Sequence, residues 1–242
     1  MTEAPPRPGS RRLGPLRLGV VVPALDAADR LPATLAALNM AADTLDIDLV
    51  VADGGSTDAT ADTAERAGAR LVAAPRGRGT QLAAGAKAVS GDWLLFVHAD
   101  TVLDAGWAEA AAEFAGDPAN AGRAGYFRFA LDDVSPEARR LERRVAWRCR
   151  TFGLPYGDQG LLVSRARYEA VGGFRPLALM EDVDLVRRLG RRSMTALPAR
   201  AVTSAERFRR GGYTRRSLRN LLCLLMFYSG LPVPLIKRIY YA

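Results

Sequence analysis

The chain has 242 residues, of which 49% are hydrophobic and 25% are charged, and its formal net charge is +8. This length and composition exclude a disordered chain and predict one α/β-sized domain with a substantial core. The charge favours anionic partners such as nucleic acid, a nucleotide or phosphate ligand, or an anionic membrane surface, although abundant arginine is also typical of GC-rich genomes. Cys149 and Cys223 match no metal spacing and are expected as reduced core thiols of a cytoplasmic protein.

The first half of the chain alternates strand and helix patterns. Residues 1–15 are rich in Pro and Arg, offer no secretory signal and are expected to form a flexible tail. Strands are predicted over 16–25, 46–53, 69–75 and 92–100, and helices over 29–38, 58–67, 80–89 and 105–114. Such alternation is typical of βαβ units and predicts an α/β fold with a mainly parallel sheet flanked by helices.

The pattern changes after Gly122. Residues 123–131 alternate like an antiparallel or edge strand, and 135–150 start a helix at a Ser-Pro pair. No internal repeat is evident, and no linker is long enough to separate two domains.

Four polar turns follow predicted strands, over 23–26, 53–58, 76–81 and 98–100. Ligands of open α/β sheets bind at the carboxyl ends of the strands, so we expect these turns to converge on one site. The Rossmann glycine fingerprint is absent after the first strand, and a lysine-bearing P-loop is missing, which argues against an ATPase.

Two of these turns suit a nucleotide. Asp53 precedes the glycines of "ADGGSTDAT" and is predicted to contact a ligand, whereas Ser56 or Asp58 is interpreted as a helix cap. Arg76 and Arg78 lie in a glycine loop just before a helix, where backbone N–H groups and guanidinium groups attract anions. A solvated loop is the alternative for these two arginines.

The segment "HADT" contains the only histidine. A spacing of two on an extended chain would point His98 and Asp100 to the same side. Mg²⁺ prefers carboxylate oxygens together with substrate phosphates, and Mn²⁺ also tolerates imidazole. We expect Asp100 to contact a metal, and leave open whether His98 is a ligand or a structural residue.

The segment "MEDVDLVRRL" begins a helix with acidic residues. Asp182 shares the inward face with apolar residues of the same helix, so its carboxylate is either a costly cap or a working base. Asp184 is predicted to form an ordinary surface pair with Arg187 and Arg188.

Taken together, these segments resemble family 2 glycosyltransferases of the GT-A fold from about residue 18 to residue 192. The resemblance is carried, in order, by "VVPALDAADRL", "VADGGSTDAT", "RGRGTQLAAGA", "GDWLLFVHADT", "VGGF" and "MEDVDLVRRL". "GDQGLLVSRARYEAVGGF" and "LMEDVDL" are similar to a bacterial subgroup that often carries His in the metal motif. Carotenoid glucosyltransferases of the staphyloxanthin type are neighbours of this subgroup.

The resemblance implies a GT-A domain over 16–205 that transfers a sugar, with inversion, from a nucleoside diphosphate-sugar, with a UDP-sugar favoured. It implies that Asp100, with His98, holds Mg²⁺ or Mn²⁺ against the diphosphate and that Asp182 deprotonates the acceptor. Asp53 matches the acid that contacts the nucleobase. The donor contacts expected at the strand ends are Pro23, Leu25, Asp53, Arg76, Arg78, Gln81 and Ala99.

The chain departs from the family pattern in four places. Asp26-Ala27 stands where Asn-Glu is usual, and Gly54, Ala83 and His98 replace an acid, an asparagine and an acid, respectively. These departures put the identity of the donor in doubt, while the expected base and the principal metal acid remain.

The acceptor is expected in the C-terminal half. The loop "LPYGDQG" offers Asp158 and Gln159 as acceptor contacts, with a plain turn as the alternative. Residues 206–242 are basic and then apolar, and the apolar run is too short and too interrupted for a transmembrane helix. This pattern suits an interfacial anchor on an anionic leaflet, the alternative being a core helix that covers the sheet.

We therefore expect an enzyme of the cytoplasm, peripheral on the inner face of the membrane, that glycosylates a lipophilic acceptor such as a carotenoid or isoprenoid lipid. The alternatives are a nucleotidyltransferase on a related sheet and an anion- or nucleic-acid-binding protein. No helix-turn-helix, zinc or aromatic RNP pattern supports the latter, and we expect no nucleic-acid partner.

Overall fold

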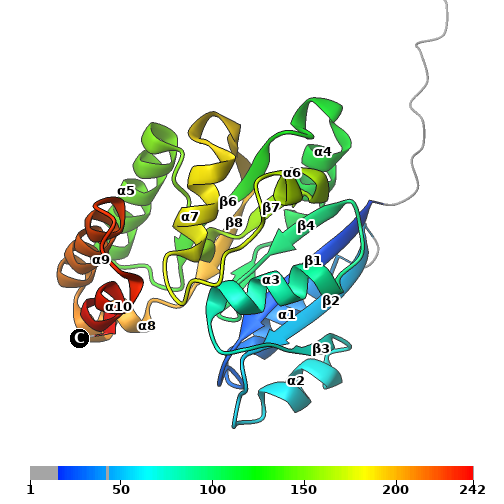
Figure 1. Cartoon of the computed structure of the whole chain (residues 1–242), viewed down its shortest axis with the longest axis horizontal. Helices are drawn as coiled ribbons and strands as arrows, with labels where there is room; N and C mark the ends of the chain where they lie inside the picture. Colours follow the sequence, from blue (N-terminus) through cyan, green and yellow to red (C-terminus); the bar gives the residue numbers. More distant parts are fainter. Residues whose placement is uncertain (1–15, 42–43, 242) are drawn as a thin grey trace, which may run out of the picture.

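The computed structural model describes residues 16–41 and 44–241, so the tail predicted over 1–15 lies outside the described residues. Within them, eight strands form one sheet in the order β3-β2-β1-β4-β7-β6-β8-β5 (Figure 1). The strands are β1 (Arg17–Ala24), β2 (Asp46–Asp53), β3 (Arg70–Ala73), β4 (Trp93–Phe96), β5 (Thr101–Leu103), β6 (Ala124–Leu131), β7 (Leu161–Ser164) and β8 (Met194–Thr203). The helices are α1 (Leu31–Asn39), α2 (Thr60–Arg66), α3 (Arg78–Ala88), α4 (Trp107–Gly116), α5 (Pro136–Phe152), α6 (Arg165–Ala170), α7 (Glu181–Leu189), α8 (Glu206–Gly211), α9 (Tyr213–Tyr228) and α10 (Val233–Tyr241).

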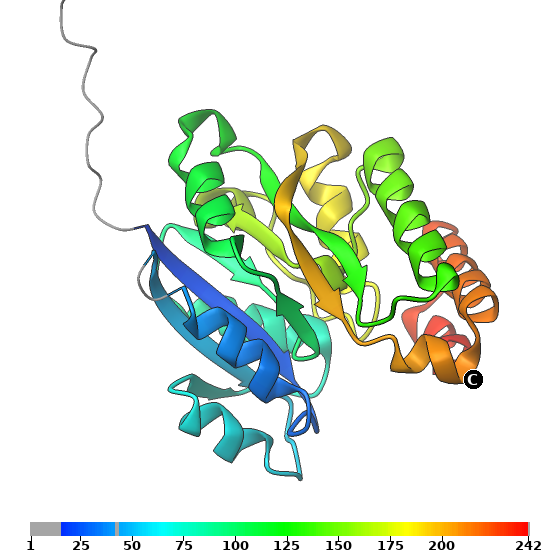
Figure 2. The ribbon, with the colours of Figure 1, turned by 180° about the vertical axis from the view of Figure 1, so that it is seen from behind.

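The first half confirms the predicted alternation of strands and helices. β1 pairs in parallel with β2 on one side and with β4 on the other, and β2 pairs in parallel with β3. Successive side chains of a strand point to opposite faces, so Val20 and Val22 pack under α1 and α4 while Val21 packs under α3 and α7. Figure 2 shows α1 and α4 over one face, and Figure 1 shows α3, α6 and α7 over the other. Helices on both faces explain why these strands are apolar throughout.

The second half adds antiparallel strands to the sheet. β7 pairs antiparallel with β4 and with β6, whereas β6 and β8 are parallel. β6 is therefore antiparallel to one neighbour, as one reading of residues 123–131 predicted. The edge-strand reading is wrong because β7 and β8 flank β6 on both sides. The short strands β5 and β7 and the ten-residue strand β8 were not predicted.

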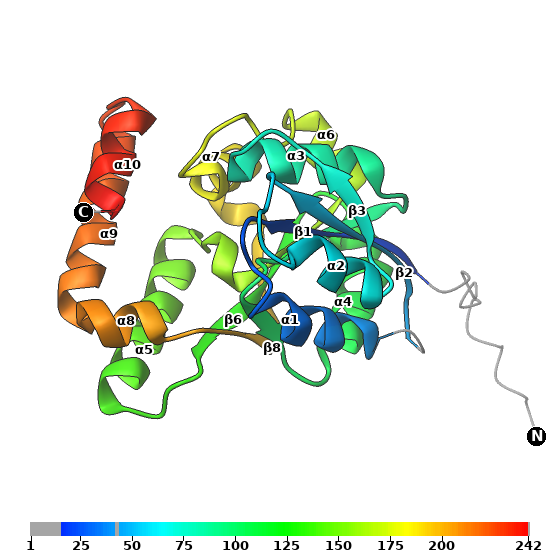
Figure 3. The ribbon, with the colours of Figure 1, turned by 90° about the horizontal axis from the view of Figure 1, so that it is seen from below.

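The C-terminal helices form a hairpin beside the sheet (Figure 3). Cys223 of α9 and Ile236 of α10 are buried against Val183 and Val186 of α7. The alternative of a core helix that covers the sheet does not hold, because the hairpin packs on α5 and α7 and not on a face of the sheet. Cys149 and Cys223 are both buried free cysteines, as expected of core thiols.

Candidate active site

A cavity of about 650 Å³ opens at the carboxyl ends of β1 and β4. The loops after these strands, the starts of α3 and α7, and the C-terminal helices form its walls. The structure thus brings most of the predicted site residues to one cavity. Those that line it are Pro23, Leu25, Arg76, Arg78, Gln81, His98, Ala99, Asp100 and Asp182.

Asp53 does not line this cavity. Its carboxylate accepts hydrogen bonds from the backbone N–H groups of Gly55 and Ser56, each at 3.0 Å, and from the hydroxyl of Ser56. The Ser56 hydroxyl in turn accepts from the backbone N–H of Asp26 at 2.9 Å. The carboxylate of Asp53 therefore holds the turn after β2 together with the loop after β1.

The predicted cap at the start of α2 is displaced by one residue. Ala59 occupies the cap position of this helix, without a side-chain cap. The carboxylate of Asp58 nevertheless accepts from the backbone N–H of Thr60 at 3.0 Å and from that of Ala28 at 3.1 Å. Asp58 is thus a structural residue that joins α2 to the loop after β1.

The side chain of Gln81 also has a structural role. It is buried, and its amide nitrogen donates to the backbone oxygens of Ala24 at 2.6 Å and Ala52 at 3.1 Å, which ties the ends of β1 and β2 together. This contact explains one departure from the family pattern. A Cβ atom on Gly54 would lie 2.9 Å from the Gln81 amide nitrogen, so the usual acid would require the Gln81 side chain to leave this position.

His98 and Asp100 reach the cavity through a turn. β4 ends at Phe96, and the backbone N–H of Thr101 donates to the carbonyl of His98 at 3.1 Å. The predicted extension of the strand to Asp100 is therefore wrong, although both side chains line the cavity.

The His98 and Asp100 pair provides an incomplete set of metal ligands. Among the described residues, no cluster of three or more His, Cys, Asp or Glu side chains could hold a metal alone. Mg²⁺ in nucleotide enzymes is bound by one or two carboxylates together with substrate phosphates, and Mn²⁺ accepts imidazole. The two side chains therefore fit a divalent metal that is held jointly with a diphosphate.

The imidazole of His98 is tightly enclosed. Burial, and then the charge of Arg78, lowers its pKa to about 4. A Cβ atom on Gly157 would lie only 2.5 Å from the Nε2 atom of His98. The ring is consequently neutral near pH 7, which is the form that can bind a metal.

Asp182 lies at the start of α7, directly on the cavity. Its Oδ2 atom accepts from the backbone N–H of Gly157 at 2.7 Å, and its Oδ1 atom accepts from that of Val183 at 2.7 Å. The preceding Met180 has a φ of 64°, and the other non-glycine residue with positive φ in the described chain is Asp26. Both line the cavity, and strained backbone of this kind gathers at functional sites.

Glu181 is fully buried beside Asp182 and forms an ion pair with Arg78 at 3.2 Å. Burial raises the pKa of Glu181 to about 7. Burial alone would lower the pKa of Arg78, but the charges of Glu181 and Asp182 raise it above its ordinary value. This pair links the start of α3, where a nucleotide is expected, to the start of α7.

The two candidate acceptor contacts in the loop before β7 differ in their environment. Gln159 is buried, and its amide nitrogen donates to the Phe127 carbonyl at 3.1 Å, so the structure does not place it on the cavity. Asp158 does line the cavity, and burial raises its pKa to about 6. Only Asp158 is positioned to meet an acceptor.

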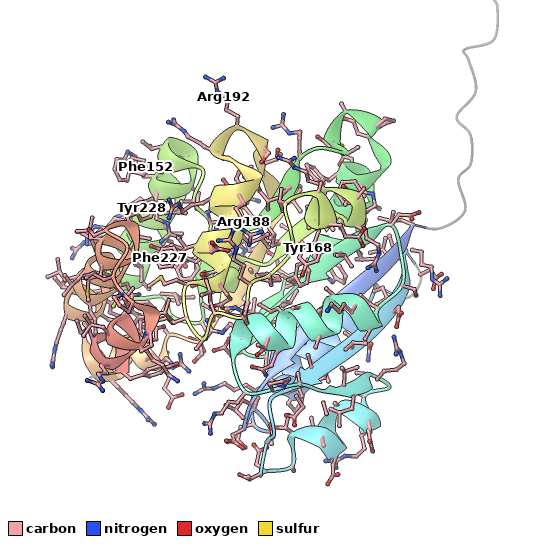
Figure 4. All side chains as sticks on the ribbon, viewed as in Figure 1. Phe152, Tyr168, Arg188, Arg192, Phe227 and Tyr228 are labelled. Atoms are coloured by element: carbon pink, nitrogen blue, oxygen red, sulfur yellow. The ribbon has the colours of Figure 1, made fainter. Side chains whose placement is uncertain are left out.

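The predicted surface pairing of Asp184 is wrong in two respects. Asp184 is buried, and its carboxylate accepts from the Nη2 atom of Arg188 at 2.6 Å and from Arg175 at 3.2 Å. The guanidinium carbon of Arg187 instead lies 4.5 Å from the centre of the Tyr228 ring. Figure 4 shows Arg188 on α7 and Tyr228, the last residue of α9. Because both residues belong to α7, the Asp184–Arg188 pair stabilises this helix.

Sequence reasoning missed the wall of the cavity that the C-terminal helices provide. Its members are Arg207, Phe208, Arg216, Asn220, Lys237, Tyr240 and Tyr241. The basic composition of this segment was visible, but it was interpreted as a membrane anchor. Nothing in the local pattern indicated that the segment returns to the strand ends.

The sheet, the cavity at its strand ends and the position of the acidic groups define a GT-A glycosyltransferase. The model of the family "Glycosyl transferase family 2" matches residues 19–172, and the chain belongs to this family. Family membership decides against the nucleotidyltransferase and nucleic-acid-binding alternatives.

Solved structures agree with this fold. Glucosyl-3-phosphoglycerate synthase from Mycobacterium tuberculosis, in complex with Mn²⁺, UDP and glucosyl-3-phosphoglycerate, is 20% identical with a TM-score of 0.58, over 95% of this chain and 88% of that one. The same enzyme with Mn²⁺ and UDP-glucose is 19% identical, with a TM-score of 0.57 over 93% and 86% of the chains. A mycobacterial protein is 22% identical, with a TM-score of 0.53 over 90% and 76%. None of the curated proteins compared with the chain matches it.

Proposed function

We propose that the protein is an inverting glycosyltransferase that uses a UDP-sugar and a divalent metal, with Asp182 as the general base. One observation carries the proposal: the carboxylates of Asp100 and Asp182 line the same cavity, from the end of β4 and the start of α7. A single displacement needs both groups, because the leaving diphosphate must be neutralised and the acceptor must lose a proton.

The donor half is formed by the sheet edge. Pro23 and Leu25 line this half from the end of β1, and Ala99 lines it from the loop after β4. Arg76 and Arg78 line the adjacent wall, from just before α3 and from its first residue. Asp100 and His98 would hold Mg²⁺ or Mn²⁺, which would neutralise charge on the diphosphate when bound. Structures of the mycobacterial synthase with Mn²⁺, Mg²⁺ and UDP support this choice of metal and donor.

The base is held in place by the turn before β7. The Gly157 N–H group fixes the Oδ2 atom of Asp182, the Val183 N–H group fixes its Oδ1 atom, and the side chain lines the cavity. As the acceptor oxygen bonds to the anomeric carbon, the bond from that carbon to the diphosphate breaks. The acceptor proton passes to Asp182, and a nucleoside diphosphate leaves.

Release of nucleoside diphosphate tests the reaction. The purified protein is incubated with UDP-, GDP- and dTDP-sugars, with a membrane lipid extract as the source of acceptor, and with or without Mn²⁺. We expect the protein to release UDP from a UDP-sugar, and we expect this release to require the metal. Release that is equal with and without metal, or absent with every donor, would contradict the proposal.

The outer face of the hairpin supports a lipophilic acceptor. Four leucines of α9 occur at helical spacing on one face and are between 49% and 61% exposed: Leu218, Leu221, Leu222 and Leu225. Arg215 and Arg219 lie on the same helix, so apolar and cationic groups occur together, as at a bilayer surface. In the described residues no helix is long and apolar enough to span a bilayer. Peripheral binding at the inner membrane face, with a carotenoid or isoprenoid lipid as acceptor, is the specific form of the proposal.

Vesicle sedimentation tests the membrane part separately. We expect binding to phosphatidylglycerol vesicles that is weaker for neutral phosphatidylcholine and is lost in the double variant Leu221→Ser, Leu225→Ser. Leu71→Ser is the control, because Leu71 is also exposed but lies on β3. Equal binding by both variants, or no binding by the wild type together with activity on soluble acceptors alone, would refute the membrane role.

A further inference from the structure

The wall that the C-terminal helices provide carries unpaired positive charge. Arg207 of α8, Arg216 of α9 and Lys237 of α10 all line the cavity. In the part of the chain that the structure describes, none of these three forms an ion pair. Of the other cations of the cavity, Arg30 pairs with Glu206 and Arg78 with Glu181, whereas Arg76 of the donor half also forms no ion pair among the described residues.

Arg216 is held in a fixed position within this wall. Its guanidinium carbon lies 5.6 Å from the centre of the Phe208 ring and 5.6 Å from that of Tyr240, and its Nη2 atom is 3.5 Å from the Tyr240 hydroxyl. Both aromatic rings also line the cavity. A guanidinium group oriented by two rings loses little conformational freedom when it binds an anion, and its planar fork matches phosphate and carboxylate oxygens.

The three cations divide between the two halves of the cavity. Arg207 lies on α8, which follows β8 and its last residue Thr203, another residue that lines the cavity. Arg216 and Lys237 lie on the hairpin, beyond the sheet edge where the donor residues gather (Figure 3). The hairpin packs on α7, the helix that carries Asp182.

Three carboxylates of the cavity indicate what Arg216 and Lys237 contribute to binding. Asp100, Asp158 and Asp182 line the same space, and their charges would repel an anionic acceptor that approaches the base. A neutral acceptor needs no compensation for that repulsion. Cations held beside the route to Asp182 provide the compensation for an anionic acceptor.

We propose that Arg216 and Lys237 form an anion subsite that binds a phosphate or carboxylate group of the acceptor. The inference rests on the proposed function, since it assigns the remaining half of that cavity to the second substrate. The acceptor then carries a negative charge near the hydroxyl or carboxyl group that receives the sugar.

The subsite can be tested without knowledge of the acceptor. The protein is first saturated with UDP and Mn²⁺ to fill the donor half, and inorganic phosphate is then titrated by calorimetry. We expect Arg216→Gln to raise the Kd for phosphate about tenfold and Lys237→Gln to raise it less. Arg192→Gln is the matched control, because Arg192 is an exposed arginine outside the C-terminal helices that does not line the cavity.

A second arm distinguishes the source of the anion. Phosphatidic acid vesicles replace inorganic phosphate, and phosphatidylcholine vesicles serve as the blank. Dependence on Arg216 with soluble phosphate alone indicates a soluble acceptor, whereas the same dependence with the vesicles indicates a lipid-borne one. Either result supports the subsite.

Two results would overturn the inference. Arg216→Gln and Arg192→Gln could bind phosphate equally well in both arms, or Arg216→Gln could weaken UDP binding about tenfold, which would make Arg216 a donor residue. UDP binding and thermal unfolding of each variant are therefore measured in parallel. If wild-type protein binds no UDP but its phosphate binding still depends on Arg216, the proposed function fails while the anion subsite stands.

Discussion

The backbone N–H of Gly157 donates a 2.7 Å hydrogen bond to the carboxylate of Asp182. The two residues come from different elements, the turn before β7 and the start of α7. Gly157 also packs against His98, so one backbone position contacts both the expected base and the metal turn. Small displacements here should therefore affect the reaction more than the stability of the fold.

Gly157→Ala tests this coupling. The added Cβ atom would lie 2.5 Å from Nε2 of His98, so the imidazole or the turn that positions Asp182 must move, whereas its 3.4 Å approach to Oδ2 of Asp182 is ordinary contact. We expect turnover to fall about 10- to 100-fold, because shifts of about 1 Å at a reacting group cost rates of this size. Gly116→Ala is the control, since no atom lies within 4 Å of its added Cβ. Equal kinetics for the two variants would show that the turn does not position the site.

Asp182→Asn should abolish most of the turnover and leave donor binding intact. The amide keeps an oxygen for the hydrogen bond from Gly157 but cannot take a proton from the acceptor. We expect a loss of about 10²- to 10⁴-fold in kcat, the range for a missing general base. The measurement is steady-state kinetics together with UDP binding, with Asp62→Asn on exposed α2 as the control. Turnover close to that of the wild type would remove Asp182 from the mechanism.

Asp184→Asn should destabilise the fold instead. Its carboxylate is paired with Arg188, and both side chains are largely buried, at 12% and 17% exposure. Removing one partner of a buried pair leaves an uncompensated charge, so we expect about 3 kcal/mol less unfolding free energy by denaturant titration. Asp46→Asn is the control, because its pair with Arg17 is exposed and should contribute less than about 1 kcal/mol. If Asp184→Asn lowered the unfolding free energy as little as Asp46→Asn, the result would mean that the Asp184–Arg188 pair is exposed to solvent.

Much of the fold and part of the site could be predicted from the sequence. Apolar runs that end in polar turns revealed the parallel strands, and β2 has its predicted bounds. Such patterns do not show which polar side chains already form hydrogen bonds within the protein. The carboxylate of Asp53 and the amide of Gln81 are used within the protein, through contacts that only the folded chain reveals. The position of Arg216 could not be predicted either, because it depends on how the C-terminal hairpin packs against residues that are distant in the sequence.

The stability of the protein should depend on pH through Glu181. Burial raises the pKa of this residue from its ordinary 4.5 to about 7, so the folded state retains a proton that the unfolded state has lost. The contribution of Glu181 to the unfolding free energy should therefore fall as pH rises from about 4.5 to 7, and its part above about pH 6.5 is the cleanest to measure. The pKa of His98, lowered to about 4 from 6.5, has the opposite effect only at more acidic pH. We expect Glu181→Gln to flatten the dependence in denaturant titrations across this range, and an unchanged slope would contradict the assignment.

Metal-dependent binding of UDP tests the central claim most directly. The measurement is the thermal unfolding midpoint with UDP, with and without Mn²⁺, for the wild type, Asp100→Ala and His98→Asp. Because Asp100 and His98 fit a metal that is shared with a diphosphate, we predict that Mn²⁺ raises the midpoint of the wild type in the presence of UDP. The rise should be lost in Asp100→Ala and kept in His98→Asp, where a second carboxylate replaces the imidazole. A wild type that shows no Mn²⁺-dependent rise, or an Asp100→Ala variant that shows the full rise, would contradict the account.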